Sequence, residues 1–255
     1  MRTISLYVEK ESFIHGLDPV TKLWLTASLL IIPFIVGNIE STLVCLGINL
    51  ALLSVARVIR RIFSILAMSL VLIITLFIIQ GMFYGGNRTE AFALGSLVFY
   101  REGLRYATLL TLRFFNIISA SMVLILTTRP SDLIESLVRR GLSPRIGYVL
   151  ASVLQIIPMM ISNTSTIMDA QRSRGMETEG RLVTRMKAYL PLMAPLVMSS
   201  LVATQERAMA LEVRAFGARN PKTFLHEEII SRHALPIRVL TSLGLVAAVI
   251  WRVIL

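Results

Sequence analysis

Two arginines in the second half of the chain share one local pattern. Each follows an alanine by four positions and precedes a small residue. The two sets are Ala170, Arg174 and Gly175, and Ala210, Arg214 and Ala215. Arginine stays protonated in proteins and presents five N–H donors in a planar fork, which suits bidentate contact with a carboxylate or with carbonyl oxygens. The repetition at a distance of 40 positions predicts two guanidinium contacts for a partner molecule.

Both arginines are expected near the C-terminal ends of helices, where unpaired carbonyl groups favour a cation. Gly175 and Gly217 can adopt positive φ and end these helices, which leaves each arginine at an exposed tip. The residues directly before the arginines, Ser173 and Val213, complete the predicted docking surface. Three charged neighbours are auxiliary candidates, namely Arg172, Glu206 and Arg207. A solvated helix face explains the auxiliary charges equally well, and a simple capping role explains either arginine alone.

The elements that carry these tips belong to a very apolar chain. Of its 255 residues, 55% are hydrophobic and 16% are charged, and its mean hydropathy is +0.72. This composition predicts an integral membrane protein, because a soluble domain carries about a quarter charged residues. The net charge of +11 does not indicate nucleic acid, since basic residues at the ends of apolar segments are what membrane topology requires.

Five apolar segments are predicted to cross the membrane as helices. They are residues 23–39, 41–56, 62–84, 106–128 and 235–255. The first two form a helical hairpin, and Arg113 inside the fourth is expected to face protein or to snorkel rather than to meet lipid. Residues 91–100 are apolar but too short to span. Retention of lysine and arginine on the cytosolic side predicts a multi-pass protein of the cell membrane with its N-terminus in the cytosol.

Two further uncharged segments, 146–168 and 188–205, are not expected to cross. Crossing would expose the basic stretch between them on the wrong side of the membrane. Their prolines, of which Pro158 is one, predict bends. We therefore expect two long, bent helices on the cytoplasmic face, in an all-α integral membrane protein. The predicted parts are 1–128 with four spans, 129–234 with these helices, and 235–255 with the last span.

The stretch from Leu17 to Leu23, Leu-Asp-Pro-Val-Thr-Lys-Leu, resembles the signature Leu-Asp-Pro-Arg-Thr-Lys-Leu of the T components of energy-coupling factor transporters, with Val20 where arginine is usual. The two arginine motifs are similar to the Ala-Arg-Gly signatures of the same family, although Ser173 and Val213 replace the alanine. The structural signature comprises Asp18, Pro19, Thr21 and Lys22. We expect a structural role for it, with an N-terminal cap at Asp18 and a cytosolic anchor at Lys22.

The resemblance implies a subunit that is not an enzyme and binds no cofactor. In that family two ABC-type ATPase subunits use ATP, and a small membrane S component binds the vitamin or metal ion. Arg174 and Arg214 would then each contact one ATPase.

Two other classes were weighed, a conventional ABC importer permease and an intramembrane enzyme. Such a permease usually carries one coupling motif, whereas this chain has two arginine motifs. An intramembrane enzyme would need acids or histidines within its spans, and this chain has none within 23–39, 41–56, 62–84 and 106–128. A metal site is not expected, since the chain has one cysteine, Cys45, and three histidines without ligand spacing. The chain has no Gly-x-x-x-x-Gly-Lys-Ser/Thr loop for binding phosphate.

Overall fold

The computed structural model describes residues 12, 14–56, 69–94, 97–176, 182–218, 223–224 and 233–254. The chain divides into two compact units. The first, here called the bundle unit, holds residues 5–137 and 228–255, and the second, the helix-pair unit, holds residues 1–4 and 138–227. Each unit is described by itself.

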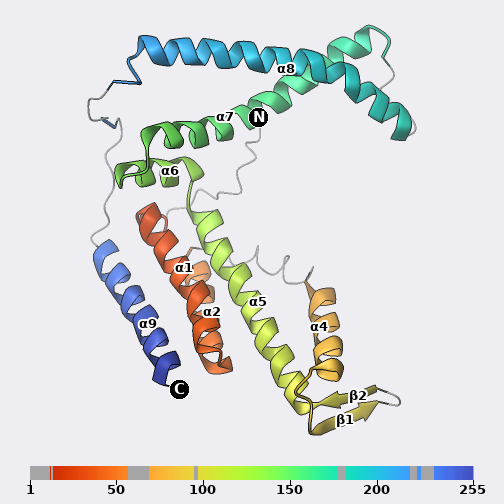
Figure 1. Ribbon diagram of the computed structural model, residues 1–255, viewed down its shortest axis with the longest axis vertical. Helices are drawn as coiled ribbons and strands as arrows, with labels where there is room; N and C mark the ends of the chain where they lie inside the picture. Colours follow the sequence, from red (N-terminus) through yellow and green to blue (C-terminus); the bar gives the residue numbers. More distant parts are fainter. Residues whose placement is uncertain are drawn as a thin grey trace. The chain divides into compact units, whose positions relative to one another are not determined.

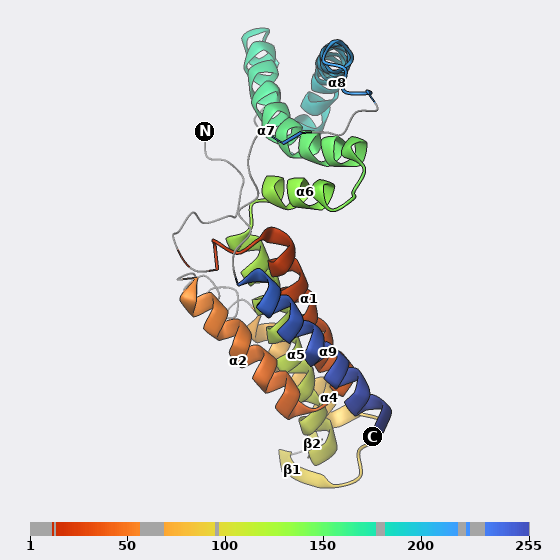
Figure 2. The same ribbon diagram turned by 90° about the vertical axis from the view of Figure 1, so that its left-hand side faces the viewer.

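Five described helices, besides the first part of the short helix before residue 138, form the bundle unit (Figure 1). They are α1 (Pro19–Val36), α2 (Ile39–Val55), α4 (Leu70–Phe83), α5 (Arg101–Thr127) and α9 (Ala234–Ile254). Helix α5 contacts α1, α2 and α4, while α1 contacts α2 and α9. Figure 2 shows α1 and α9 side by side. Gly37 at positive φ ends α1 just before α2 begins, so the predicted helical hairpin is confirmed.

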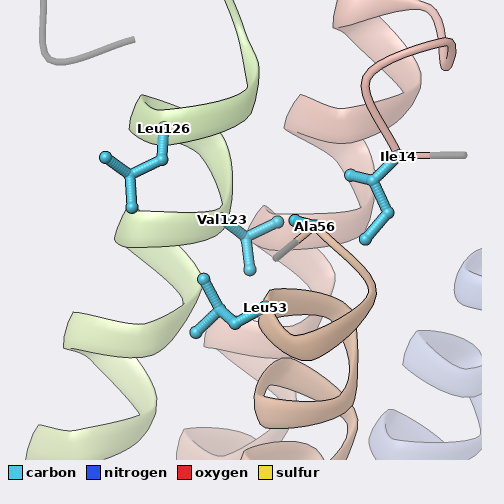
Figure 3. Packing of buried hydrophobic residues seen from close by; sticks show 5 residues of the cluster. All are labelled: Ile14, Leu53, Ala56, Val123 and Leu126. Atoms are coloured by element: carbon cyan, nitrogen blue, oxygen red, sulfur yellow. The ribbon is translucent and has the colours of Figure 1, made fainter. Parts of the chain in front are cut away.

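The apolar core of the bundle unit is small. One cluster joins the segment before α1 to α2 and α5 (Figure 3), and a second joins α1 to α2. The first contains Ile14, Leu53, Ala56, Val123 and Leu126, and the second contains Leu25, Leu29 and Cys45. Many large apolar side chains of these helices point outward instead, as suits helices surrounded by lipid.

Four helices are long and apolar enough to cross a membrane by length and composition. They are α1, α5, α9 and α7, which runs from Pro144 to Ser173. Helices α2 and α4 are apolar but shorter. The predicted span 62–84 lies partly outside the described residues, and its described part contains α4. The chain is an all-α integral membrane protein, as its composition predicts.

A β-hairpin, which the sequence did not predict, occupies the apolar stretch 91–100. Strand β1 (Glu90–Leu94) pairs antiparallel with β2 (Leu97–Tyr100), and the rings of Phe92 and Phe99 stack at 4.9 Å. Glu102, in the first turn of α5, accepts a hydrogen bond of 2.5 Å from the Thr89 hydroxyl. The hairpin is thereby tied to the start of α5.

The helix-pair unit is built on α7 and α8 (Leu182–Val213), which contact each other. Figure 1 shows that both helices change direction along their length, and Pro158 interrupts the hydrogen bonds of α7. The predicted segments 146–168 and 188–205 lie within these longer helices. A short helix, α6 (Pro130–Arg139), precedes α7, and the boundary between the units falls after its Leu137.

Candidate functional site

Helix α7 ends in a hydrogen-bonded motif that places Arg174 at its C-cap. The N–H of Gly175 donates to the Arg172 carbonyl at 2.9 Å, and the N–H of Met176 donates to the Gln171 carbonyl at 3.1 Å. Gly175 adopts φ +83°, the left-handed conformation that glycine permits. This pair of bonds is a Schellman motif, which satisfies two of the carbonyls that a helix end leaves unpaired.

Helix α8 ends in the same motif, with Arg214 at the equivalent position. The N–H of Ala215 donates to the Glu212 carbonyl and that of Phe216 to the Leu211 carbonyl, both at 2.9 Å. The residue at positive φ is Ala215, at +55°, and not Gly217. The prediction that Gly217 ends this helix is therefore wrong. An alanine takes the left-handed position at a cost of about 1–2 kcal/mol relative to a right-handed residue.

Both arginine side chains are exposed. Among the residues that the structure describes, neither the Arg174 nor the Arg214 guanidinium forms a hydrogen bond or an ion pair, so their donors are open to a partner molecule. The residues just before them differ in chemistry. Ser173 is exposed and donates its hydroxyl to the Asp169 carbonyl at 3.0 Å, whereas Val213 leaves 89% of its surface in solvent. Ala170 and Ala210 are also exposed one turn earlier.

The auxiliary candidates occupy different places. Arg172 pairs with Asp169 at 3.7 Å on the exposed face of α7. Arg207 lies 3.9 Å from the Met159 sulfur, so its side chain reaches across to α7. Glu206 is exposed. Arg207 thus contributes to the contact between the paired helices, while Arg172 remains beside the α7 tip.

The two tips lie at opposite ends of the helix pair. In Figure 1, α7 and α8 run in opposing directions, so that the end of α8 is near the beginning of α7. The ring of Phe216 packs against Tyr148, in the second turn of α7, with centroids 5.4 Å apart. This contact fixes the α8 tip to the neighbouring helix.

The signature residues near the start of α1 form a buried polar cluster in the bundle unit. Asp18, only 1% exposed, pairs with the Arg238 guanidinium of α9. The Thr21 hydroxyl accepts from Arg238 Nε at 2.7 Å and donates to Asp18 Oδ2 at 3.1 Å. Asp18 stands at the N-cap position but makes no side-chain cap bond, so the prediction of a capping role is wrong. Pro19 begins the helix, where its missing N–H costs nothing.

Lys22 belongs to the same cluster and binds the end of another helix. Its ammonium donates to the Thr127 carbonyl at 2.8 Å, in the last turn of α5, and to the His15 carbonyl at 3.2 Å. A cation at this place is favoured by the partial negative charge of the helix end. Lys22 is 2% exposed, so it is a buried tie between helices rather than the solvent-facing anchor that we expected. The sequence had not singled out Arg238 or Thr127, which lie far along the chain.

Arg113 faces protein, as predicted. Its Nη2 donates to the Pro33 carbonyl at 3.1 Å, and its guanidinium lies 5.0 Å from the centroid of the Phe34 ring. Within the described ranges, no three His, Cys, Asp or Glu side chains gather closely enough to hold a metal ion.

Fold and site together define a multi-pass helical membrane protein that presents two arginine-bearing helix ends. The model of the CbiQ family, described as cobalt transport protein, matches residues 10–224. The chain belongs to this family.

Relatives support the same assignment over nearly the whole length. The energy-coupling factor transporter transmembrane protein EcfT of Clostridium kluyveri is 30% identical over 236 residues, which cover 88% of this chain and 87% of the relative. The EcfT protein of Heliobacterium modesticaldum is 31% identical over 261 residues, which cover 98% and 97% of the two chains. That of Streptococcus thermophilus is 28% identical over 253 residues, covering 95% and 96%.

Proposed function

We propose that this chain is the coupling subunit of an energy-coupling factor transporter. In this role it docks two ABC-type ATPase subunits on its arginine tips. It then transmits their ATP-driven motion to a small membrane subunit that binds a vitamin or a transition-metal ion. The observation that carries the proposal is the repeated Schellman end of α7 and α8, in which Arg174 and Arg214 occupy equivalent C-cap positions.

The chemistry of the tips suits docking on protein grooves. Each guanidinium has open donors within the described part of the chain, and each can bind a carboxylate or two carbonyl oxygens in a bidentate manner. Because Ser173 and Val213 differ in polarity, the two tips are matched in backbone geometry but not in side-chain surface. This asymmetry supports docking to two ATPase surfaces that are not identical.

The proposal requires the tips to lie in the cytosol, where ATP is available. Placing the N-terminus and residues 129–234 on the cytosolic side of the cell membrane keeps the basic stretch between α7 and α8 inside. The ATP is bound and hydrolysed by the partner ATPases in this scheme.

Co-purification tests the proposal. Truncating one partner of a charge-assisted contact at a desolvated interface costs about 2–5 kcal/mol. We therefore expect Arg174→Ala or Arg214→Ala alone to weaken the hold on one ATPase, and the double variant to release both and abolish uptake. Arg252→Ala removes the same charge from an exposed position on α9 and should leave the complex intact. If the double variant still co-purifies with both ATPases and supports normal uptake, the docking assignment is wrong.

A further inference from the structure

The polar cluster of Asp18, Thr21, Lys22 and Arg238 joins three helix ends of the bundle unit. Asp18 and Thr21 hold Arg238 near the start of α9, and Lys22 holds the Thr127 carbonyl at the end of α5. All of these contacts originate in the first turn of α1 or just before it. The starts of α1 and α9 and the end of α5 are thereby fixed to one another.

The ion pair joins a buried Asp18 to an Arg238 side chain that is 32% exposed, and a pair of this kind fixes the register of its helices more than it adds stability. Well-packed apolar residues often replace a buried ion pair without loss of stability. The ion pair, however, forms only when the two helices that carry it have one particular relative position. The Arg238 fork meets two acceptors at once, since Nε binds Thr21 and Nη2 binds Asp18. A shift of α9 along α1 would break both bonds together, so the cluster fixes the register of these two helices.

The segments that connect the bundle unit to the helix-pair unit adjoin two of these fixed ends. Residues 128–137 follow α5 and lead toward residue 138, where the helix-pair unit begins, and residues 228–233 lead back into α9. In the proposed cycle, displacement of residues 138–227 therefore reaches the bundle unit along the covalent chain, through residues 128–137 to the end of α5 and through residues 228–233 to the start of α9. These are the ends that Lys22, Asp18 and Thr21 hold.

We propose that Asp18, Thr21, Lys22 and Arg238 form a force-bearing anchor, here called the anchor cluster, in addition to shaping the fold. The inference rests on the proposed function, since it supposes that the helix-pair unit is displaced during transport. The anchor cluster makes α1, α5 and α9 move as one body when that unit is displaced. Without it, α9 slides against α1 and the displacement is lost before it reaches the rest of the bundle unit.

The test compares ATP hydrolysis with uptake in the complete transporter, reconstituted into vesicles. Thr21→Val keeps the shape of the side chain but removes the hydroxyl that bridges Arg238 and Asp18. Thr21→Ser retains this hydroxyl and is the conservative counterpart. Arg238→Gln removes the ion pair itself. Ser242→Ala is the matched control, because it removes an exposed hydrogen bond of 3.1 Å between the same two helices, donated by Trp24 Nε1.

We expect Thr21→Val and Arg238→Gln to keep both ATPases bound and hydrolysing ATP, while uptake per ATP falls at least about fivefold, the lower end of typical coupling between sites. Thr21→Ser and Ser242→Ala should behave as the unaltered protein does. Normal uptake per ATP in both anchor variants would overturn the proposal, as would loss of the ATPases or of the folded subunit in both. The Arg174→Ala, Arg214→Ala double variant in the same vesicles reports separately on the docking function.

Discussion

The side-chain amide of Asn116 donates a hydrogen bond of 2.8 Å to the backbone carbonyl of Leu29. That carbonyl would ordinarily accept the N–H of the residue four positions later, but this residue is Pro33, which has no N–H. Within a membrane, neighbouring helices must satisfy such freed groups, because water is absent. Helix α5 therefore repairs the gap that Pro33 leaves in α1, and Asn49 of α2 donates in turn to Asn116 at 2.8 Å.

Replacing Asn116 by leucine should destabilise the bundle unit by about 1–2 kcal/mol, since the Leu29 carbonyl and the Asn49 amide both lose their partner. In a Pro33→Ala background the helix supplies its own N–H to Leu29, so the same replacement should cost less. Unfolding free energies in a detergent titration measure both differences. Equal costs in the two backgrounds would show that Asn116 does not compensate for the proline.

Much of the helical architecture could be predicted because its signals are local. The hairpin of α1 and α2 follows from two apolar segments separated by Gly37 and Asn38, and α5 stops where Arg129-Pro130 forbids continuation. The two arginine-bearing helix ends could be predicted for the same reason, since a Schellman motif involves only a few consecutive residues. Even there, the choice between Ala215 and Gly217 depended on backbone geometry that composition does not determine.

Contacts between distant residues could not be predicted in the same way. Arg238 reaches Asp18 across 220 positions, and Lys22 reaches Thr127 across 105. Nothing in a single sequence indicates which buried acid and base will meet. The β-hairpin was missed because its strands lie in one short apolar segment without a polar alternation.

The left-handed Ala215 predicts an opposite pair of effects at the two tips. Ala215→Gly should relieve strain and stabilise the end of α8 by about 0.5–1 kcal/mol, after allowance for the greater freedom of glycine in the unfolded chain. Gly175→Ala should weaken the α7 end by about 1 kcal/mol. A Cβ at Gly175 would meet nothing within 4 Å, so the penalty there is one of backbone conformation. Amide hydrogen exchange at positions 175–176 and 215–216 measures both, and changes of the same sign would contradict the assignment.

Helices α4 and α5 approach so closely at Gly103 that no larger residue fits. A Cβ there would lie 2.3 Å from the Gln80 carbonyl oxygen, so backbone would have to move. Gly103→Ala should therefore destabilise the bundle unit by about 1–3 kcal/mol, as overpacking does. Gly47→Ala is the matched control, because its Cβ would meet nothing within 4 Å on the exposed face of α2. Thermal unfolding in detergent should separate the two variants, and similar midpoints would refute the steric argument.

The proposed topology predicts which introduced cysteines are accessible from outside the cell. In a Cys45→Ala background, a cysteine at Thr178 should resist an impermeant thiol reagent in intact cells and react after the membrane is opened. Thr178 lies outside the described residues, but it belongs to the basic stretch between residues 169 and 187 that the positive-inside rule retains. Gly85→Cys, at an open position in the loop after α4, should react from outside. The reverse pattern would place the arginine tips on the outer side and end the docking proposal.

Val213 predicts that the α8 tip docks partly through apolar contact. The Val213 side chain is 89% exposed at the helix end and contributes no burial free energy there. Burying it in a partner's groove would contribute about 1.5–3 kcal/mol. Val213→Ser should therefore weaken binding of the ATPase at this tip by about 1–2 kcal/mol and leave the other ATPase bound. Arg252→Ala, at an exposed position on α9, serves as the control and should not weaken either contact. Titration of each ATPase against the purified subunit separates the two tips, and unchanged binding by Val213→Ser would leave the arginine as the main contact at the α8 end.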